Sequence, residues 1–441
     1  MKSIPIVAIV GRPNVGKSSL FNRLVGRRES IVSHVSGTTR DRIMAETTWY
    51  EFRMMLVDTG GLDVFPDEDI WKQVKYQIDV AIEDADVIMM VVDSFDGVTD
   101  ADKDVANVLR RSDKPVVLVA NKCDNDARNS MVGEFHQLGL SDPIAASAYH
   151  NFGIDEIMNR VSGSLPNEVI EDDSDVDVKI AVLGRTNVGK SSLVNCITKQ
   201  QRSIVSDIPG TTRDSLDTLI EMDDWTISLV DTAGIRRRGK IEPGIEHFSV
   251  LRAMRSINRS DVVILMLDTS ELAMNQDTHI AQYILDSFKG VVVNVNKWDL
   301  SRGLGISKDE ALKHVMHQFR FISYAPICFT NSLSSEGVPA LLKKTLEVFD
   351  ERNKTVPRYE LRRIVMNAIA EHPPATSGRK GLKIFSVKQD QTSPPSFTFY
   401  VNSPELVHFS YQRYLENAIR KKFAFSGSPL RLRFRHLDSR K

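Results

Sequence analysis

The sequence GRPNVGKSSL, at Gly11–Leu20, recurs with one letter changed as GRTNVGKSSL at Gly184–Leu193. Both copies contain the pattern GxxxxGK[ST] directly after an apolar, β-branched run. Glycines in this pattern let consecutive backbone amides wrap a phosphate, and the lysine reaches the outer phosphate oxygens. The sequence therefore predicts two phosphate-binding loops, each between a strand and a helix.

The spacing between the two copies holds along the chain. GTTRD and DTGG, which begins at Asp58, each recur 173 residues later, the second as DTAG at Asp231. NKCD at Asn121 and NKWD at Asn296 lie 175 residues apart, so the register shifts by only two positions. A period of this length is about one domain, which is too long for a solenoid repeat. The pattern indicates that a whole fold is duplicated.

Apolar runs of strand length alternate with amphipathic stretches in both copies, which is typical of an α/β fold with a mainly parallel sheet. The runs cover residues 4–10, 52–58, 87–93 and 115–122, and then 179–184, 226–231, 262–268 and 290–297. Each run ends where a motif begins, and ligands bind at such carboxyl ends of parallel strands. After residue 354 the pattern changes to a helix, a loop, two strands, a helix over Pro404–Phe423 and a last strand.

The domain limits follow from these patterns. Residues 166–178 hold six acidic residues and no basic one, which is typical of a solvated linker. We therefore expect one α/β domain at residues 1–166, an acidic linker at 167–178, a second α/β domain at 179–353 and a smaller α+β domain at 354–441.

The composition excludes several classes of protein. Hydrophobic residues make up 41% and charged residues 26% of the 441 residues, and no apolar run is long enough to cross a membrane. The first residues read as a strand and not as a secretion signal, and three widely spaced cysteines argue against a disulfide framework or a zinc site. We expect a cytoplasmic monomer without membrane or DNA contacts.

The motifs NKCD and NKWD predict which base is bound. Their aspartates, Asp124 and Asp299, can accept hydrogen bonds from both N1–H and the exocyclic amine of guanine, a pair of donors that adenine lacks on that edge. A single NKxD could be an ordinary turn, but both copies follow a strand-like run downstream of a P-loop. The sequence predicts that GTP and GDP, rather than ATP, bind at two sites.

A magnesium ion is expected at each P-loop. The hydroxyl after the P-loop lysine would contact the ion, the aspartate of DTxG would hold it through water, and a threonine of GTTRD would close over it when GTP is bound. These ligands are Ser18, Asp58 and Thr39 in the first copy and Ser191, Asp231 and Thr212 in the second, with Thr38 and Thr211 as alternatives. The last glycine of DTxG would sense the γ-phosphate through its N–H. The predicted catalytic residues are Lys17, Thr39, Gly61, Lys190, Thr212 and Gly234.

With these motifs the chain resembles the Der (EngA) family of bacterial GTPases, which have two G domains of the Era type and a C-terminal KH-like domain. The resemblance covers essentially the whole chain and includes YQRYLENAIRKKFAFSGSPLRLRF at Tyr411–Phe434. It implies a role in maturation of the large ribosomal subunit, with GTP-dependent rearrangement of the domains governing ribosome association. It also implies that backbone amides of a Ser-Ala pair, here Ser147 and Ala148, contact the guanine.

Two departures from the family lie in the second copy, where Thr186 replaces a proline and Asn331-Ser332 replaces Ser-Ala. The expected contacts there come from the backbone, so nucleotide binding should survive. The predicted nucleotide contacts of the first copy are Gly11, Asn14, Val15, Gly16, Lys17, Ser18, Ser19, Asp58, Asn121, Lys122, Asp124, Ser147 and Ala148. Those of the second are Gly184, Asn187, Val188, Gly189, Lys190, Ser191, Ser192, Asp231, Asn296, Lys297, Asp299, Asn331 and Ser332.

The residues after DTxG raise the question of how water is activated. Leu62 and Ile235 stand where Ras-like enzymes have a glutamine that orients the attacking water, and neither side chain can form a hydrogen bond. No arginine finger is evident in the sequence, so another positive charge should neutralise the transition state. In related GTPases an asparagine at the position of Asn14 and Asn187 coordinates K⁺. We predict K⁺-stimulated hydrolysis; the alternative is that each asparagine only caps its loop.

The C-terminal segment suggests the partner. Residues 357–441 carry sixteen Lys or Arg and six Asp or Glu, a net charge of +10, while the whole chain carries −1. Interleaved aromatic residues favour RNA over a membrane, and with the resemblance they predict contact with rRNA and the large ribosomal subunit. The GXXG clamp of ordinary KH domains is missing, because GRKG at Gly378–Gly381 lies in the wrong place. The rival hypotheses are a GTP-sensing RNA-binding scaffold with negligible hydrolysis and, more distantly, a nucleotide kinase.

Overall fold

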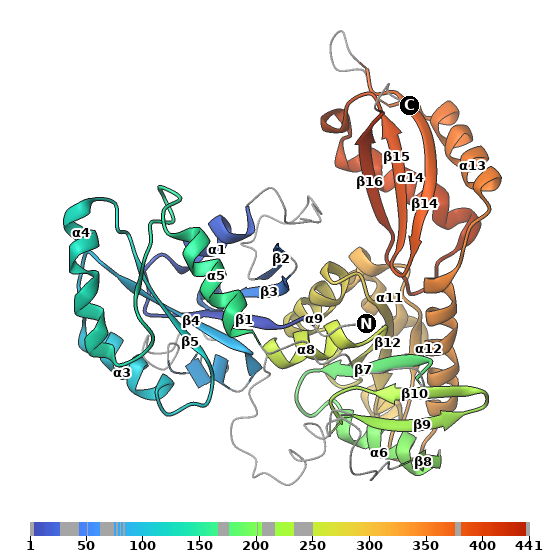
Figure 1. The fold of residues 1–441 in the computed structure, drawn as a ribbon. Helices are drawn as coiled ribbons and strands as arrows, with labels where there is room; N and C mark the ends of the chain where they lie inside the picture. The colour runs from blue at the N-terminus through green and yellow to red at the C-terminus, as the bar shows by residue number, and fades with distance from the viewer. Residues whose placement is uncertain are drawn as a thin grey trace. The chain divides into compact units, whose positions relative to one another are not determined.

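The computed structural model describes residues 4–26, 44–50, 52–61, 75, 78–79, 81–82, 84–165, 176–200, 202–204, 217–232, 250–374 and 381–437 (Figure 1). The chain divides into two compact units. One is formed by residues 1–170 with 249–255, and the other by residues 171–248 with 256–441.

A six-stranded sheet forms the centre of the first unit, in the order β2-β3-β1-β4-β5-β6. Its strands run parallel except β2, which is antiparallel to β3. Central strands that are covered on both faces require continuous apolar sequence, and all five residues of β1 are fully buried. The strands are β1 (Ile6–Val10), β2 (Met44–Trp49), β3 (Phe52–Asp58), β4 (Val87–Asp93), β5 (Val116–Asn121) and β6 (Ile144–Ala145).

Helices cover both faces of this sheet. Residues of α1 and α5 pack into one core with the strands, and residues of α3 and the 3-10 helix η2 pack into the other. Helix α3 begins at a capping box, in which Thr99 and Asp102 satisfy each other's backbone amides. The helices are α1 (Lys17–Val25), η1 (Thr59–Gly61), α3 (Asp100–Leu109), α4 (Asp126–Met131), η2 (Val132–Leu138) and α5 (Ile154–Ser164).

The second unit contains a seven-stranded sheet in the order β13-β12-β11-β7-β10-β9-β8. Strands β7, β10, β11, β12 and β13 are parallel, and β8 and β9 form an antiparallel edge. The strands are β7 (Val178–Gly184), β8 (Arg202–Ile204), β9 (Thr218–Met222), β10 (Trp225–Leu229), β11 (Val262–Asp268), β12 (Gly290–Asn296) and β13 (Ile327–Phe329). The helices are α6 (Lys190–Gln200), α8 (Val250–Arg259), of which residues 250–255 belong to the first unit, α9 (Asn275–Asp286), η3 (Trp298–Leu300), α10 (Ser301–Leu304), α11 (Lys308–Gln318), η4 (Arg320–Ile322) and α12 (Val338–Asn353).

The predicted α/β class is therefore confirmed for both copies. The eight apolar runs correspond to β1, β3, β4, β5, β7, β10, β11 and β12. The sequence did not indicate the antiparallel edge strands, because an edge strand such as β2 (MAETTW) is half polar and lacks the continuous apolar pattern of a central strand.

The last part of the second unit is the expected α+β arrangement. Its three strands have the order β14-β15-β16, with β14 antiparallel and β16 parallel to β15. The elements are α13 (Arg358–Glu371), β14 (Ile384–Thr392), β15 (Pro395–Val401), η5 (Pro404–Leu406), α14 (Phe409–Phe423) and β16 (Arg431–His436). The last helix begins at Phe409 and not at Pro404, because His408 caps it and accepts a hydrogen bond from the Ser410 amide. None of the helices in the described ranges combines the length and apolar character that crossing a membrane requires.

This α+β part is joined to the seven-stranded sheet within the second unit. The amide of Val291, at the start of β12, donates to the Gly427 carbonyl at 2.8 Å, and the Gly427 amide donates to the Tyr324 backbone carbonyl at the same distance. Arg352, at the end of α12, is 2% exposed and donates to the Phe288 carbonyl and the Ser393 hydroxyl. Hydrogen bonds from backbone amides and from a buried arginine therefore connect the two parts within this unit.

Candidate functional site

Each P-loop leaves a central strand and enters a helix, at the carboxyl edge of its sheet. Gly11 follows β1 with a φ of 150°, and a β-carbon on it would lie 2.3 Å from the Val91 carbonyl oxygen. Gly184 ends β7, and its β-carbon would lie 2.5 Å from the Met266 carbonyl oxygen. Only glycine fits such a position, which explains why both loops begin with it. The backbone is thus brought close to the neighbouring strand, and its amides surround the entry to α1 or α6.

The P-loop lysines lie inside their own loops. The Lys17 ammonium donates to the Gly11 carbonyl at 2.7 Å and to the Arg12 carbonyl at 2.9 Å. Burial lowers the pKa of Lys17, and the nearby charge of Asp58 partly opposes this. Lys190 repeats the arrangement, with a 2.9 Å bond to the Gly184 carbonyl and a second to the Arg185 carbonyl. A positive charge held inside a ring of backbone amides suits a phosphate group.

A hydroxyl and a carboxylate meet beside the first loop. Ser18 donates to Asp58 at 2.5 Å, and Asp58 also accepts from the Gly60 amide at 3.0 Å. Both groups are hard oxygen donors of the kind that Mg²⁺ prefers, so they fit the predicted ion together with phosphate oxygens and water. Among the described residues, no group of three or more His, Cys, Asp or Glu is arranged so that it could hold a metal ion. In the second copy Asp231 accepts from the Ser256 hydroxyl at 3.2 Å.

The asparagine of each NKxD motif connects the loop that contains it to the P-loop by a hydrogen bond. The Asn121 side chain donates to the Val15 carbonyl at 2.9 Å, and Asn296 donates to Val188 at 2.8 Å. Val15 and Val188 are themselves buried. Two motifs that lie about a hundred residues apart in the sequence thus form one site in each copy.

The lysine of each NKxD motif is paired with an aspartate that the sequence reasoning missed. Lys122 lies 2.6 Å from Asp93, and Lys297 lies 2.7 Å from Asp268. Burial raises the pKa of Asp268, but hydrogen bonds from Lys297 and Ser270 outweigh it and leave the pKa below its usual value. The signal was available, because both aspartates end the preceding strand and lie 175 residues apart.

The predicted guanine readers have different surroundings in the two copies. The Asp124 carboxylate accepts from the Ser147 hydroxyl at 2.7 Å and from Arg128 at 3.1 Å. In the second copy Asn331 stands in place of Ser147, and its side chain accepts from the Leu333 amide at 3.0 Å within its own turn. The two sites therefore share their motifs but not the support of their aspartates.

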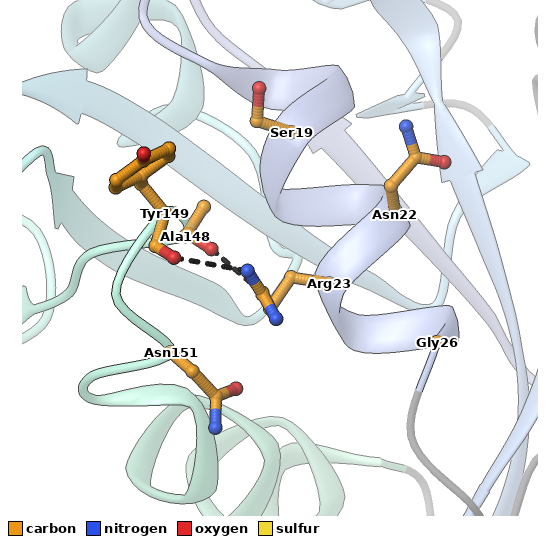
Figure 2. Close-up of a pocket in the computed structure, with 7 residues that line it drawn as sticks. All are labelled: Ser19, Asn22, Arg23, Gly26, Ala148, Tyr149 and Asn151. Carbon is orange, nitrogen blue, oxygen red and sulfur yellow. Dashed lines mark hydrogen bonds between the residues drawn. The ribbon is translucent and has the colours of Figure 1, made fainter.

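A pocket of about 490 Å³ opens beside the first site (Figure 2). It is bordered by Ser19 of α1 and by Ala148, both of which the sequence predicts as nucleotide contacts. Arg23 extends from α1 toward the loop after β6 and donates to the carbonyls of Ala148 at 2.7 Å and Tyr149 at 3.0 Å. The sequence did not indicate Arg23, because it lies outside every motif.

The remaining predicted residues fall into two groups. Asn14 and Asn187 have left-handed φ values of 66° and 63° and exposed side chains, and within the described ranges neither side chain is recorded in a hydrogen bond. Ser192 lies in α6, and Gly61 ends η1. Five predicted residues lie outside the described residues, and they are Thr38, Thr39, Thr211, Thr212 and Gly234.

Comparison with known proteins agrees with this geometry. The family model described as "50S ribosome-binding GTPase" matches residues 6–122 and again 179–297. A second model, "KH-domain-like of EngA bacterial GTPase enzymes, C-terminal", matches residues 355–435.

Two relatives that match over nearly their whole length have the same name. The chain is 45% identical over 445 residues to GTPase Der of Chloroflexus aggregans, which covers 98% of each chain. It is 42% identical over 434 residues to GTPase Der of Brevibacillus brevis, which covers 97% of this chain and 98% of the other. A solved structure of Era with MgGDPNP and a 16S ribosomal RNA fragment matches 75% of this chain and 93% of that one, at 18% identity and a TM-score of 0.31, which is too low to add to the assignment. The chain belongs to the Der (EngA) family of GTPases, with two P-loop GTPase domains followed by a KH-like domain.

Proposed function

We propose that this chain is a GTP-hydrolysing switch in ribosome biogenesis that acts in assembly of the large ribosomal subunit. The nucleotide state would rearrange its domains and thereby control association with the ribosome and rRNA. The observation that carries the proposal is that, in each copy, the P-loop lysine donates to carbonyls of its own loop and the NKxD asparagine donates to a carbonyl of the same loop. The description of the matched family model, which names the 50S ribosome, supports the choice of subunit.

Different residues at each site would contact the phosphates, the guanine and the metal ion. Lys17 and Lys190 would neutralise the β- and γ-phosphates, and Asp124 and Asp299 would accept hydrogen bonds from the guanine. Ser18 with Asp58, and Ser191 with Asp231, would hold Mg²⁺, which supplies charge stabilisation at the phosphates. Thr39, Thr212, Gly61 and Gly234 would respond to the γ-phosphate. These assignments are the proposed site residues, with domain limits at 1–166, 167–178, 179–353 and 354–441.

K⁺ is proposed as the additional positive charge. The exposed side chains of Asn14 and Asn187 are oriented by the same left-handed backbone and are free of recorded hydrogen bonds in the described residues, which favours ligation over capping. The P-loop arginines are held elsewhere, since Arg12 pairs with Asp96 at 2.7 Å and Arg185 with Asp277 at 3.0 Å. GTP turnover should therefore be several-fold faster in KCl than in NaCl at equal ionic strength, and equal rates would remove this idea.

The KH-like domain would supply the RNA contact. Lys388 on β14 and Arg433 on β16 flank Thr398 in register, so both project from one face of the sheet. Basic side chains on a regular surface suit the phosphate backbone of RNA rather than a particular sequence. We infer a cytoplasmic monomer that meets the ribosome through this domain.

Pull-down against separated ribosomal subunits tests the proposal. The chain should bind the large subunit, with a clear difference between GDP and a non-hydrolysable GTP analogue. Binding that is the same with both nucleotides, together with turnover that ribosomal subunits and K⁺ do not raise, would favour the GTP-sensing scaffold. Equal competition by adenosine nucleotides would contradict both functions.

A further inference from the structure

The second nucleotide site contains a buried polar set that the first lacks. Asn294 on β12 and Thr330 after β13 are 0% and 1% exposed, and the Asn294 side chain donates to the Thr330 hydroxyl at 2.9 Å. The matching residues of the first copy are Val119 and Ala146, both fully buried. The first copy thus builds the same part of the same fold from apolar side chains alone.

The hydrogen bonds of Asn294 and Thr330 continue to Asn296, the asparagine of the NKWD motif. The Thr330 hydroxyl lies 3.1 Å from the Asn296 side-chain oxygen, which also accepts from the Ser332 amide at 3.1 Å and the Ser332 hydroxyl at 2.7 Å. The hydroxyl has one proton and lies near two side-chain oxygens, that of Asn294 at 3.2 Å and that of Asn296 at 3.1 Å, and the contact to Asn296 is the shorter. Asn296 in turn donates to Val188 of the P-loop. A continuous path of hydrogen bonds therefore runs from the interior of β12 to the phosphate-binding loop.

The first site holds its recognition asparagine differently. Asn121 is recorded as accepting only the Ala148 amide, at 3.1 Å, among the described residues. Arg23 of α1 instead holds the loop after β6, because its guanidinium donates to the carbonyls of Ala148 and Tyr149. The residue equivalent to Arg23 in α6 is Cys196, whose sulfur contacts the Ser335 hydroxyl at 3.0 Å and cannot make the same two bonds.

Burying an asparagine and a threonine in a sheet core costs free energy that an apolar pair would not. The first copy demonstrates that the fold does not need this pair. We propose that Asn294, Thr330 and Ser332 are positioning residues of the second guanine site, where they fix Asn296 against the P-loop and slow nucleotide release. The inference rests on the proposed binding of guanine nucleotides at this site.

The test isolates each site in the full chain. Asp124→Asn leaves the first site unable to accept both guanine donors, so release of labelled GDP then reports the second site; Asp299→Asn isolates the first site in the same way. In the Asp124→Asn background, Thr330→Val should lower stability and speed GDP release about threefold to fivefold, since one hydrogen bond to Asn296 is lost.

The decisive variant carries the residues of the first copy, Asn294→Val with Thr330→Ala and Ser332→Ala. It leaves no buried polar partner unpaired, so stability should return toward the original value, while GDP release stays about tenfold faster. The same substitutions should not change release from the first site. Release at the original rate in this variant would overturn the proposal, because it would assign the polar set to folding alone. Failure of labelled GDP to bind the Asp124→Asn chain at all would instead count against the proposed function.

Discussion

A β-carbon built on Gly189 would lie 2.2 Å from the side-chain nitrogen of Asn296, and one built on Gly16 would lie 2.4 Å from the side-chain nitrogen of Asn121. Two non-bonded atoms do not come this close, so each asparagine occupies space that only a glycine leaves open. The asparagine reaches the P-loop only because that glycine has no side chain.

Gly16→Ala should therefore abolish high-affinity nucleotide binding at the first site. The methyl group would displace Asn121, and the φ of 90° would add backbone strain. Titration with labelled GDP in the Asp299→Asn background measures the effect, for which we expect at least about a hundredfold loss of affinity. Gly133→Ala is the matched control, because nothing lies within 4 Å of its β-carbon position and affinity should stay unchanged.

Ser147→Ala should weaken guanine binding at the first site about fivefold. The hydroxyl holds one oxygen of Asp124, and without it the carboxylate samples other orientations. Calorimetry with GDP, one site at a time, gives the affinity. The counterpart substitution, Asn331→Ala, should change the GDP affinity of the second site by no more than about twofold, because the Asn331 side chain is bonded within its own turn. An equal loss at both sites would show that the side chain acts on the loop and not on the aspartate.

Acid should destabilise the second GTPase domain through Asp268. Although burial raises the pKa of this carboxyl, hydrogen bonds from Lys297 and Ser270 bring it below the usual value in the folded protein. The stabilisation is therefore present above the unfolded pKa of about 4 and is lost as pH falls through the folded pKa. Denaturant unfolding between about pH 6 and pH 3 should have a smaller pH dependence in Asp268→Asn. If Asp268→Asn leaves the slope of the unfolding free energy against pH unchanged, the ion pair between Asp268 and Lys297 is not a source of the pH dependence.

Arg352→Ala should destabilise the second unit by about 2–3 kcal/mol. The variant leaves the Phe288 carbonyl without its donor and opens a gap at the junction with the KH-like domain. Burial lowers the pKa of Arg352 to about 10, so the side chain keeps its charge at neutral pH. Thermal unfolding measures the loss. Lys344→Ala on the same helix removes only a surface pair with Glu347 and should stay within about 0.5 kcal/mol of the original.

The sequence predicted the two sheets and the position of the P-loop, DTxG and NKxD motifs at the ends of strands, because motif spacing and apolar runs are local signals. It could not predict which side chains meet across the sheet. Arg23 reaches a loop 125 residues away, and Thr330 meets Asn294 from a neighbouring segment. Such pairs have no fixed spacing and no composition that marks them, so only the three-dimensional arrangement reveals them.

Arg23 of α1 holds this loop in the first copy, whereas Thr330 contacts the NKxD asparagine from within the sheet in the second. After a gene duplication, the residues that contact the same ligand in both copies are expected to stay alike, while the residues that support them can change. Asn294 and Thr330 in one half, and Val119 and Ala146 in the other, are such a difference in the residues behind the motif. A small molecule that occupies the cavity next to Arg23 would then distinguish two pockets that receive the same metabolite.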